Sequence, residues 1–362
     1  MSAPIRVLIL STFPHGRLSF ELKNLKKQYH IFAYQIDRYL KSHGNGQFLV
    51  IHAQMPERGK SERIVNSVEY RCFKCPQTDF TIVCESRGVF YRPDKFFNII
   101  REKTSKGIMT FCASNVELGK EDVLFYMVPS GRRNRRRCKL LNWTADDILC
   151  SPKQNPFKLR ILIDHNYYGP HIRMLNNDLT VELTNQVCKF VKEKREQGMD
   201  IEVRRFITGG IETVDIDNPQ EMIQYVQGSG LSYSEVCEEY SKTDIFIVTH
   251  MECMGLSVLE SAMSGALILA PKGYIKHELI RDLNHIQFER YINWEHVMNK
   301  LDYAESRRRA KCFSWSNNIQ KIIDVMVNYD EYLKNDLRFH NNHSQKNQEI
   351  REQKPLPLKT SI

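Results

Sequence analysis

The chain has 362 residues, of which 41% are hydrophobic and 26% charged, and 52 Lys and Arg against 43 Asp and Glu give a net charge of +9. This composition excludes a disordered chain and a small disulfide-stapled domain, because the sequence is long and apolar enough to bury a core. No run approaches the roughly 18 consecutive apolar residues that span a bilayer, and the apolar stretch at residues 5–10 is too short for a signal peptide. We therefore expect a cytoplasmic protein of two domains with reduced cysteines.

The first part of the sequence alternates between apolar runs and amphipathic segments. A helix is predicted at residues 19–41, because apolar side chains recur there at helical spacing. Strands are predicted at residues 5–10, 47–52, 80–84, 108–112 and 122–128. This alternation is typical of a parallel sheet with crossover helices. The proline-containing segment 151–156 predicts a linker, so we assign the first domain to residues 1–155.

The same alternation begins again after the linker and predicts a second domain over residues 156–334. Strands are predicted at residues 160–164, 202–208, 245–249 and 267–270, and helices at 178–196, 233–241, 258–264 and 296–312. A last helix at about 315–334 is expected to pack back on the first domain. The polar tail at residues 335–362 predicts disorder. The expected fold class is α/β, with two doubly wound Rossmann-like domains facing each other across a cleft.

Residues 244–270 form the most informative segment, which reads as a buried strand, a loop, a helix and a second strand. Ligands of open parallel sheets bind beyond the carboxyl ends of strands, where this loop falls. Gly255 permits close backbone approach, and the amides of Gly255, Leu256 and Ser257 at a helix start suit a diphosphate. The carboxylates of Glu252 and Glu260 can accept hydrogen bonds from vicinal hydroxyls, as in a nucleotide-linked sugar.

The same residues also permit a purely structural interpretation. Ser257 and Glu260 have the spacing of a capping box, in which Glu260 would reach back to the Ser257 amide. Gly265 has the position of a helix-terminating glycine.

Glu252, Gly255, Glu260, Ala262 and Gly265 reproduce the pattern E-x-x-G-x-x-x-x-E-x-A-x-x-G. This pattern resembles the E-x7-E signature of retaining glycosyltransferases with the GT-B fold, most closely the GT4-like group. The resemblance extends over residues 161–323. It implies a GT-B fold, with a nucleotide-sugar donor in the second domain and a hydroxyl acceptor in the first. It also implies a UDP- or GDP-sugar as co-substrate, no cofactor and no metal.

The resemblance assigns roles to individual positions. The Glu252 position contacts sugar hydroxyls, the Glu260 position holds the ribose, and the backbone of residues 255–257 approaches the diphosphate. Gly209 and Gly210 resemble the family's glycine turn in the donor site. The family's basic pair near the diphosphate is incomplete here, and Arg173 is the candidate for a phosphate contact. His15, Gly16 and Arg17 follow the first strand and are expected to face the cleft or the acceptor.

Two motifs invite a metal interpretation, and we expect neither to bind one. Asp215 and Asp217 form a D-x-D, but they lie in a polar loop where acidic residues are common. Cys72 and Cys75 form a single C-x-x-C without the second pair that a zinc site needs.

The net charge is concentrated in one block of five arginines, Arg132, Arg133, Arg135, Arg136 and Arg137. Such a block can bind an anionic membrane surface, which would make the protein membrane-peripheral, or it can be a solvated loop. It also supports a rival prediction, a non-catalytic nucleic-acid-binding protein. Two further alternatives keep the fold: a sugar-nucleotide epimerase or hydrolase, and a degenerate transferase that serves as a partner subunit.

Overall fold

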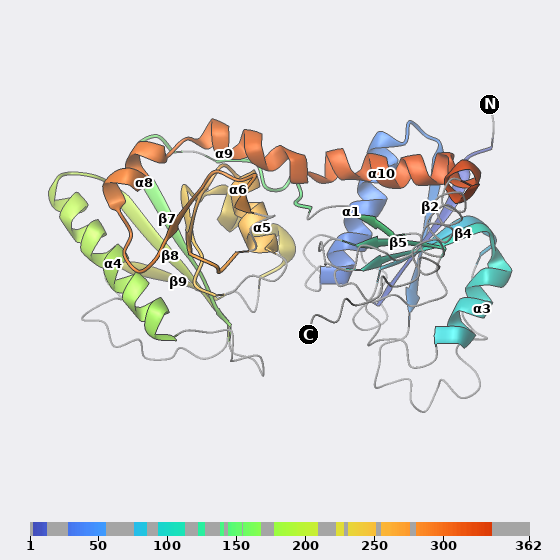
Figure 1. Cartoon of the computed structure of the whole chain (residues 1–362), viewed down its shortest axis with the longest axis horizontal. Helices are drawn as coiled ribbons and strands as arrows, with labels where there is room; N and C mark the ends of the chain where they lie inside the picture. The colour runs from blue at the N-terminus through green and yellow to red at the C-terminus, as the bar shows by residue number, and fades with distance from the viewer. Residues whose placement is uncertain are drawn as a thin grey trace, which may run out of the picture.

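The protein forms two lobes, each built on its own parallel sheet (Figure 1). The computed structural model describes residues 3–12, 28–55, 76–84, 93–112, 122–126, 138–140, 144–153, 155–167, 177–208, 222–227, 231–250, 255–275 and 280–334. The predicted α/β class with two doubly wound sheets is confirmed within these residues. None of the described helices is long and apolar enough to cross a membrane.

The first lobe carries a sheet with the strand order β2-β1-β3-β4-β5-β6. Its strands are β1 (Ile5–Thr12), β2 (Phe48–Met55), β3 (Thr78–Cys84), β4 (Thr104–Cys112), β5 (Val123–Tyr126) and β6 (Cys138–Leu140). All neighbouring pairs are parallel. Its described helices are α1 (Gln28–His43) and α3 (Pro93–Lys103). The sequence prediction lacked β6 and α3 and began the first helix at residue 19, which lies outside the described residues.

The second lobe carries a parallel sheet with the strand order β12-β11-β10-β7-β8-β9. Its strands are β7 (Leu159–Tyr167), β8 (Ile201–Thr208), β9 (Ile223–Gln227), β10 (Ile245–Ile247), β11 (Leu267–Pro271) and β12 (His285–Phe288). Helices α4 (Asn177–Glu196), α5 (Tyr233–Ser241) and α6 (Leu256–Met263) belong to this lobe. The outer strands β9 and β12 were not predicted, because glutamine and histidine interrupt their apolar residues.

The predicted single helix at residues 296–312 is wrong. The structure has α8 (Trp294–Lys300), α9 (Tyr303–Ala310) and a 3-10 turn, η6 (Lys311–Phe313). The first of these helices ends because Leu301 is extended, with ψ 106°, and the Asp302 side chain then accepts a hydrogen bond from the Glu305 amide at 2.9 Å. A side-chain cap inside an apparently continuous pattern starts a new helix.

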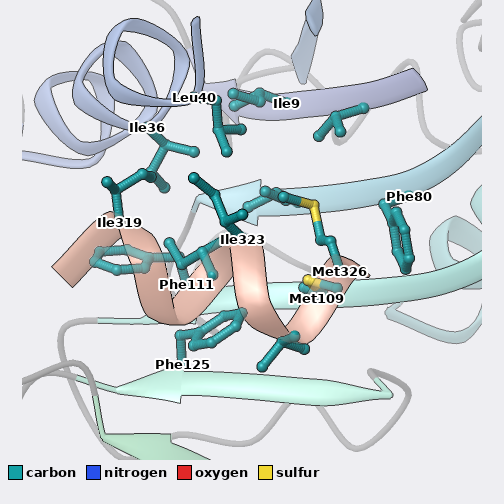
Figure 2. Close-up of a cluster of buried hydrophobic side chains, with 14 of the residues drawn as sticks. Ile9, Ile36, Leu40, Phe80, Met109, Phe111, Phe125, Ile319, Ile323 and Met326 are labelled. Atoms are coloured by element: carbon teal, nitrogen blue, oxygen red, sulfur yellow. The ribbon is translucent and has the colours of Figure 1, made fainter. Parts of the chain in front are cut away.

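Helix α10 (Trp315–Val327) returns from the second lobe to the first. The helix predicted at about 315–334 is interrupted at Asn328, and a separate helical segment follows at 329–334. Ile319, Ile323 and Met326 point from α10 into the core between the first sheet and helix α1 (Figure 2). Trp315 is fully buried there, with its ring 5.7 Å from that of Phe111. Because these apolar side chains lie on one face of α10, docking on the first sheet is the way to bury them.

The two lobes also meet through α1. Ile31 and Tyr34 of α1 pack against the core of the second lobe. Arg38 of the same helix contacts Asp146 at 3.2 Å, in the segment that leads into β7. Tyr39 donates a hydrogen bond to Asp147 at 2.8 Å. Helix α1 is therefore part of both lobes' packing.

Candidate functional site

The second sheet reverses its direction of winding between β7 and β10. From β7 the chain proceeds outward through β8 and β9, and it then returns to the other side of β7 for β10, β11 and β12. Ligands of doubly wound sheets bind at such a switch point, beyond the carboxyl ends of the strands. Helix α6 follows β10 there, so its first turn lies at the expected position for a ligand.

Helix α6 begins at a glycine whose backbone conformation is left-handed. Gly255 is the N-cap residue with φ 63° and ψ 28°, and no side chain caps the helix. This corrects the capping-box interpretation, because Ser257 lies inside the first turn. The amides of a helix's first turn point away from the rest of the helix, an arrangement that can bind an anion. Gly265, with φ 97°, follows the other end of α6.

Three polar side chains meet at the start of α6. Asp164 is fully buried at the point where β7 extends beyond its pairing with β10. Its Oδ2 lies 3.5 Å from Nδ1 of His250, and Ser257 Oγ donates to the same oxygen at 3.5 Å. The sequence prediction named neither Asp164 nor His250 as a site residue. The available signal was that Asp164 directly follows the apolar run at 161–163, and that His250 comes two residues after the apolar run at 245–248 of the neighbouring strand.

Glu260 is on the second turn of α6 and is only 7% exposed. Its Oε1 accepts a hydrogen bond from the Tyr233 hydroxyl on α5 at 2.9 Å. Tyr233 in turn accepts from Gln35 Nε2 on α1, in the other lobe, at 3.0 Å. Burial raises the pKa of Tyr233 well above its ordinary value, and the nearby Cys237 and Glu260 raise it further, so the hydroxyl keeps its proton.

Two thiols lie next to this carboxylate. Cys150 and Cys237 are buried, with their sulfur atoms 3.6 Å apart. Burial raises the pKa of Cys150 well above its ordinary value, so it remains a neutral thiol at neutral pH. Arg307 of α9 donates to the carbonyl oxygens of Cys150 and Met263 at 3.0 and 2.7 Å. It thereby fastens the segment before β7 to the end of α6.

The structure brings together four of the predicted site residues: Gly255, Leu256, Ser257 and Glu260. Leu256 is partly buried and packs against the core of the first lobe, so the start of α6 lies where the lobes meet. The other predicted site residues lie outside the described residues: His15, Gly16, Arg17, Arg173, Gly209, Gly210 and Glu252. The arginine block at 132–137, the Asp215–Asp217 pair and the Cys72–Cys75 pair lie outside them as well. Within the described part of the chain, no group of three or more His, Cys, Asp or Glu side chains could hold a metal ion.

No protein-family model matches the chain, and no curated protein matches its sequence. Solved structures do match. A Listeria monocytogenes protein assigned as a UDP-N-acetylglucosamine 2-epimerase superposes with a TM-score of 0.52 at 12% identity, over 91% of this chain and 98% of that one. The lipopolysaccharide outer core galactosyltransferase WaaB superposes with a TM-score of 0.51 at 8% identity, over 90% and 100%. An α-glucosyltransferase in complex with UDP and a 13-mer DNA superposes with a TM-score of 0.51 at 12% identity, over 90% of this chain and 100% of that one.

The chain has the GT-B fold. The superpositions extend over almost the whole of each partner, so both lobes and their order along the chain are shared. At these identities the similarity describes the fold, and the chemistry has to be argued from the site itself.

Proposed function

We propose that this protein is a glycosyltransferase that moves a sugar from a nucleotide-diphosphate donor to a hydroxyl acceptor. The observation that carries the proposal is the position of Glu260 and the glycine-started helix α6 at the switch point of the second sheet. A buried carboxylate next to a helix start combines a hydroxyl acceptor group with an anion-binding surface. A ribose linked to a diphosphate fits both parts, because its hydroxyls can donate to the carboxylate and its diphosphate carries the negative charge that the helix start binds.

In this proposal Glu260 holds the ribose, and the amides of Gly255, Leu256 and Ser257 hold the diphosphate. Glu252 orients the sugar, and Arg173 stabilises the phosphate charge. Residues 156–334 bind the donor and residues 1–155 the acceptor, through His15, Gly16 and Arg17 among others. Gly209 and Gly210 line the donor site. The donor is a UDP- or GDP-sugar, and the reaction needs neither metal nor cofactor.

The chemistry that this arrangement serves is departure of the diphosphate from the sugar's anomeric carbon. That bond breaks as the acceptor oxygen forms a new bond to the same carbon, and the acceptor proton passes to the leaving phosphate. The configuration is retained. Negative charge grows on the leaving oxygen in the transition state, where prearranged amides of a helix start stabilise it most. Closure of the lobes would exclude water and limit hydrolysis of the donor.

A thermal-shift screen against UDP, GDP, ADP and their sugar conjugates tests the donor site. A ligand at 100 times its Kd should raise the free energy of unfolding by about 2.7 kcal/mol in the wild type. Glu260→Ala should lose this gain, whereas Glu295→Ala, at an exposed carboxylate of α8, should keep it. If no nucleotide stabilises the wild type, or if Glu260→Ala responds fully, the proposed donor site is wrong.

A second candidate is epimerisation or hydrolysis of the nucleotide sugar, favoured by the superposition on the Listeria protein. It predicts donor turnover without any added acceptor. Incubation with the donor sugar identified in the screen, with and without a mixture of hydroxyl acceptors, separates the two reactions. A product that forms only in the presence of an acceptor supports the transferase.

The arginine block requires a separate test, because a transferase can use it to approach an anionic membrane or a charged acceptor. Pelleting with vesicles of neutral and of anionic lipid measures membrane attachment directly. Neutralising Arg135, Arg136 and Arg137 should abolish attachment to anionic vesicles. If nucleic-acid binding survives Glu260→Ala but is lost in this triple variant, and no sugar nucleotide binds, the non-catalytic alternative replaces the proposed function.

A further inference from the structure

A buried chain of hydrogen bonds runs from the first lobe to the carboxylate of Glu260. Gln35 belongs to α1, Tyr233 to α5 and Glu260 to α6, and their exposed fractions are 1%, 5% and 7%. Gln35 Nε2 lies 3.0 Å from the Tyr233 oxygen, which lies 2.9 Å from Glu260 Oε1. The three side chains are separated by 198 and 27 residues in the sequence, so only the tertiary fold connects them.

The direction of these hydrogen bonds follows from the chemistry of the groups. An ionised carboxylate only accepts, so the Tyr233 hydroxyl donates a hydrogen bond to Glu260 and must accept one from the amide nitrogen of Gln35. The raised pKa of Tyr233, caused chiefly by burial, keeps that proton on the hydroxyl. A carboxylate has about four lone-pair sites on its two oxygens, so this bond is compatible with hydrogen bonds from a ligand.

Gln35 is held in place by the packing of α1. On one side, its neighbour Ile36 is fully buried in the core of the first lobe. On the other side, Tyr34 packs against the core of the second lobe. Arg38 and Tyr39 then bind the segment before β7. The backbone at Gln35 is therefore held by contacts with both lobes, and its buried side chain places the amide nitrogen against Tyr233, which contacts Glu260.

A glutamate side chain has several rotatable bonds, and a ribose recognised by its hydroxyls needs the carboxylate in one orientation. Removing that freedom in advance reduces the entropy that a ligand must lose on binding. We propose that Gln35 and Tyr233 are positioning residues that orient the Glu260 carboxylate for a nucleotide ribose. Nucleotide affinity then depends on a contact from the first lobe. This inference rests on the proposed function.

The test compares two ligands that differ only at the ribose. Isothermal titration calorimetry measures the affinity for UDP, GDP or ADP, whichever the screen identifies, and for its 2′,3′-dideoxy counterpart. In Tyr233→Phe, affinity for the ribonucleotide should fall about tenfold, as expected for a lost hydrogen bond to a charged group, while the dideoxy affinity changes less than about twofold. In Gln35→Met, which preserves shape without the amide, the ribonucleotide affinity should fall about threefold. Tyr240→Phe is the matched control, because Tyr240 is a 2% exposed tyrosine of the same helix.

The positioning role is overturned if Tyr233→Phe lowers the melting temperature but leaves the ratio of ribose to dideoxy affinity unchanged, as Tyr240→Phe should. That result would mean that the hydrogen bonds of the Tyr233 hydroxyl stabilise the folded core and do not orient Glu260 for the ribose. If Tyr233→Phe does not fold, Gln35→Met decides the question, since it leaves the hydrogen bond from Tyr233 to Glu260 in place. A wild type that binds both ligands equally, or neither, refutes the ribose site itself and is recognised before any variant is measured.

Discussion

Removing Arg160 should leave a buried charge without its partner. Arg160 is the second residue of β7 and Asp244 precedes β10, at the amino edge of the second sheet and away from the candidate site. The exposed fractions of Arg160 and Asp244 are 7% and 1%. Arg160 Nη2 donates to Oδ1 of Asp244 at 3.1 Å, and Nε donates to Oδ2 at 3.3 Å. The backbone amide of Arg160 also donates to Oδ2, at 2.7 Å.

Arg160→Met removes two hydrogen bonds and the strongest cationic partner from a buried carboxylate, on which Arg204 acts more weakly. Breaking such a buried pair costs about 3–5 kcal/mol in other proteins. Arg160→Met combined with Asp244→Asn removes the charge as well, and the asparagine oxygen still accepts from the backbone amide. The double variant should therefore lose only about 1 kcal/mol, the net value of ordinary hydrogen bonds. The difference between the two variants is the contribution of the unpaired charge.

The stability that Arg160→Met loses relative to the wild type should also depend on pH. Burial already raises the pKa of Asp244 above its ordinary 3.8, although Arg160 opposes this shift, so loss of Arg160 raises the pKa further. A carboxyl with a raised native pKa favours its protonated form in the folded state. The folded protein therefore recovers stability as the pH falls through that pKa, down to the unfolded value of 3.8.

Urea unfolding followed by circular dichroism at pH 7.5 and 5.5 measures both effects. We expect Arg160→Met to lose at least about 3 kcal/mol at pH 7.5 and less at pH 5.5, and the double variant to show neither the large loss nor the pH effect. Nucleotide affinity should be unchanged, because the pair lies at the opposite edge of the sheet from the first turn of α6. A loss below about 1 kcal/mol at both pH values would refute the reasoning.

Three further outcomes are expected. Gly107→Ala would place a Cβ against the Tyr329 ring and should lower the free energy of unfolding by about 1–3 kcal/mol, measured by thermal denaturation. A second substitution, Tyr329→Leu, should recover part of this loss. If the stability losses of the two single variants simply add in the double variant, the clash is contradicted. The pKa values of Cys150 and Tyr233 are raised above 9.0 and 10.0, so the folded state retains protons that the unfolded chain loses. Stability should therefore decline above pH 9 for Cys150 and above pH 10 for Tyr233, by up to about 1.4 kcal/mol per pH unit for each group. Tyr233→Phe should remove the tyrosine's share of the slope. Gly255→Ala, at φ 63°, should cost about 1–2 kcal/mol and weaken nucleotide binding measured by calorimetry; unchanged binding would exclude close approach of a ligand to this backbone.

Sequence reasoning was most successful where a short segment carries its own signal. The apolar runs of β7, β10 and β11 were predicted because buried parallel strands are apolar on both faces. Helix α5 was predicted with its observed bounds, and Ser232 and Glu235 form a capping box at its start. By contrast, the capping box predicted in α6 was wrong, because Gly255 starts that helix two residues before Ser257. The same short pattern thus forms a capping box in α5 but not in α6. The conformation of the residues before each helix decides which residue is the N-cap.

The sequence by itself determined the α/β class and the repeat of the strand and helix pattern, and it predicts a site at Gly255 and Glu260. These properties follow from local periodicity and from residue types that few other arrangements would place together. Only the tertiary structure decided that Asp164 meets His250 and Ser257, and that Gln35 reaches Glu260 through Tyr233. Such contacts join residues that are distant in the chain and whose polar side chains carry no periodic signal. Their positions depend on how sheets and helices pack, because that packing brings the ends of separate elements together.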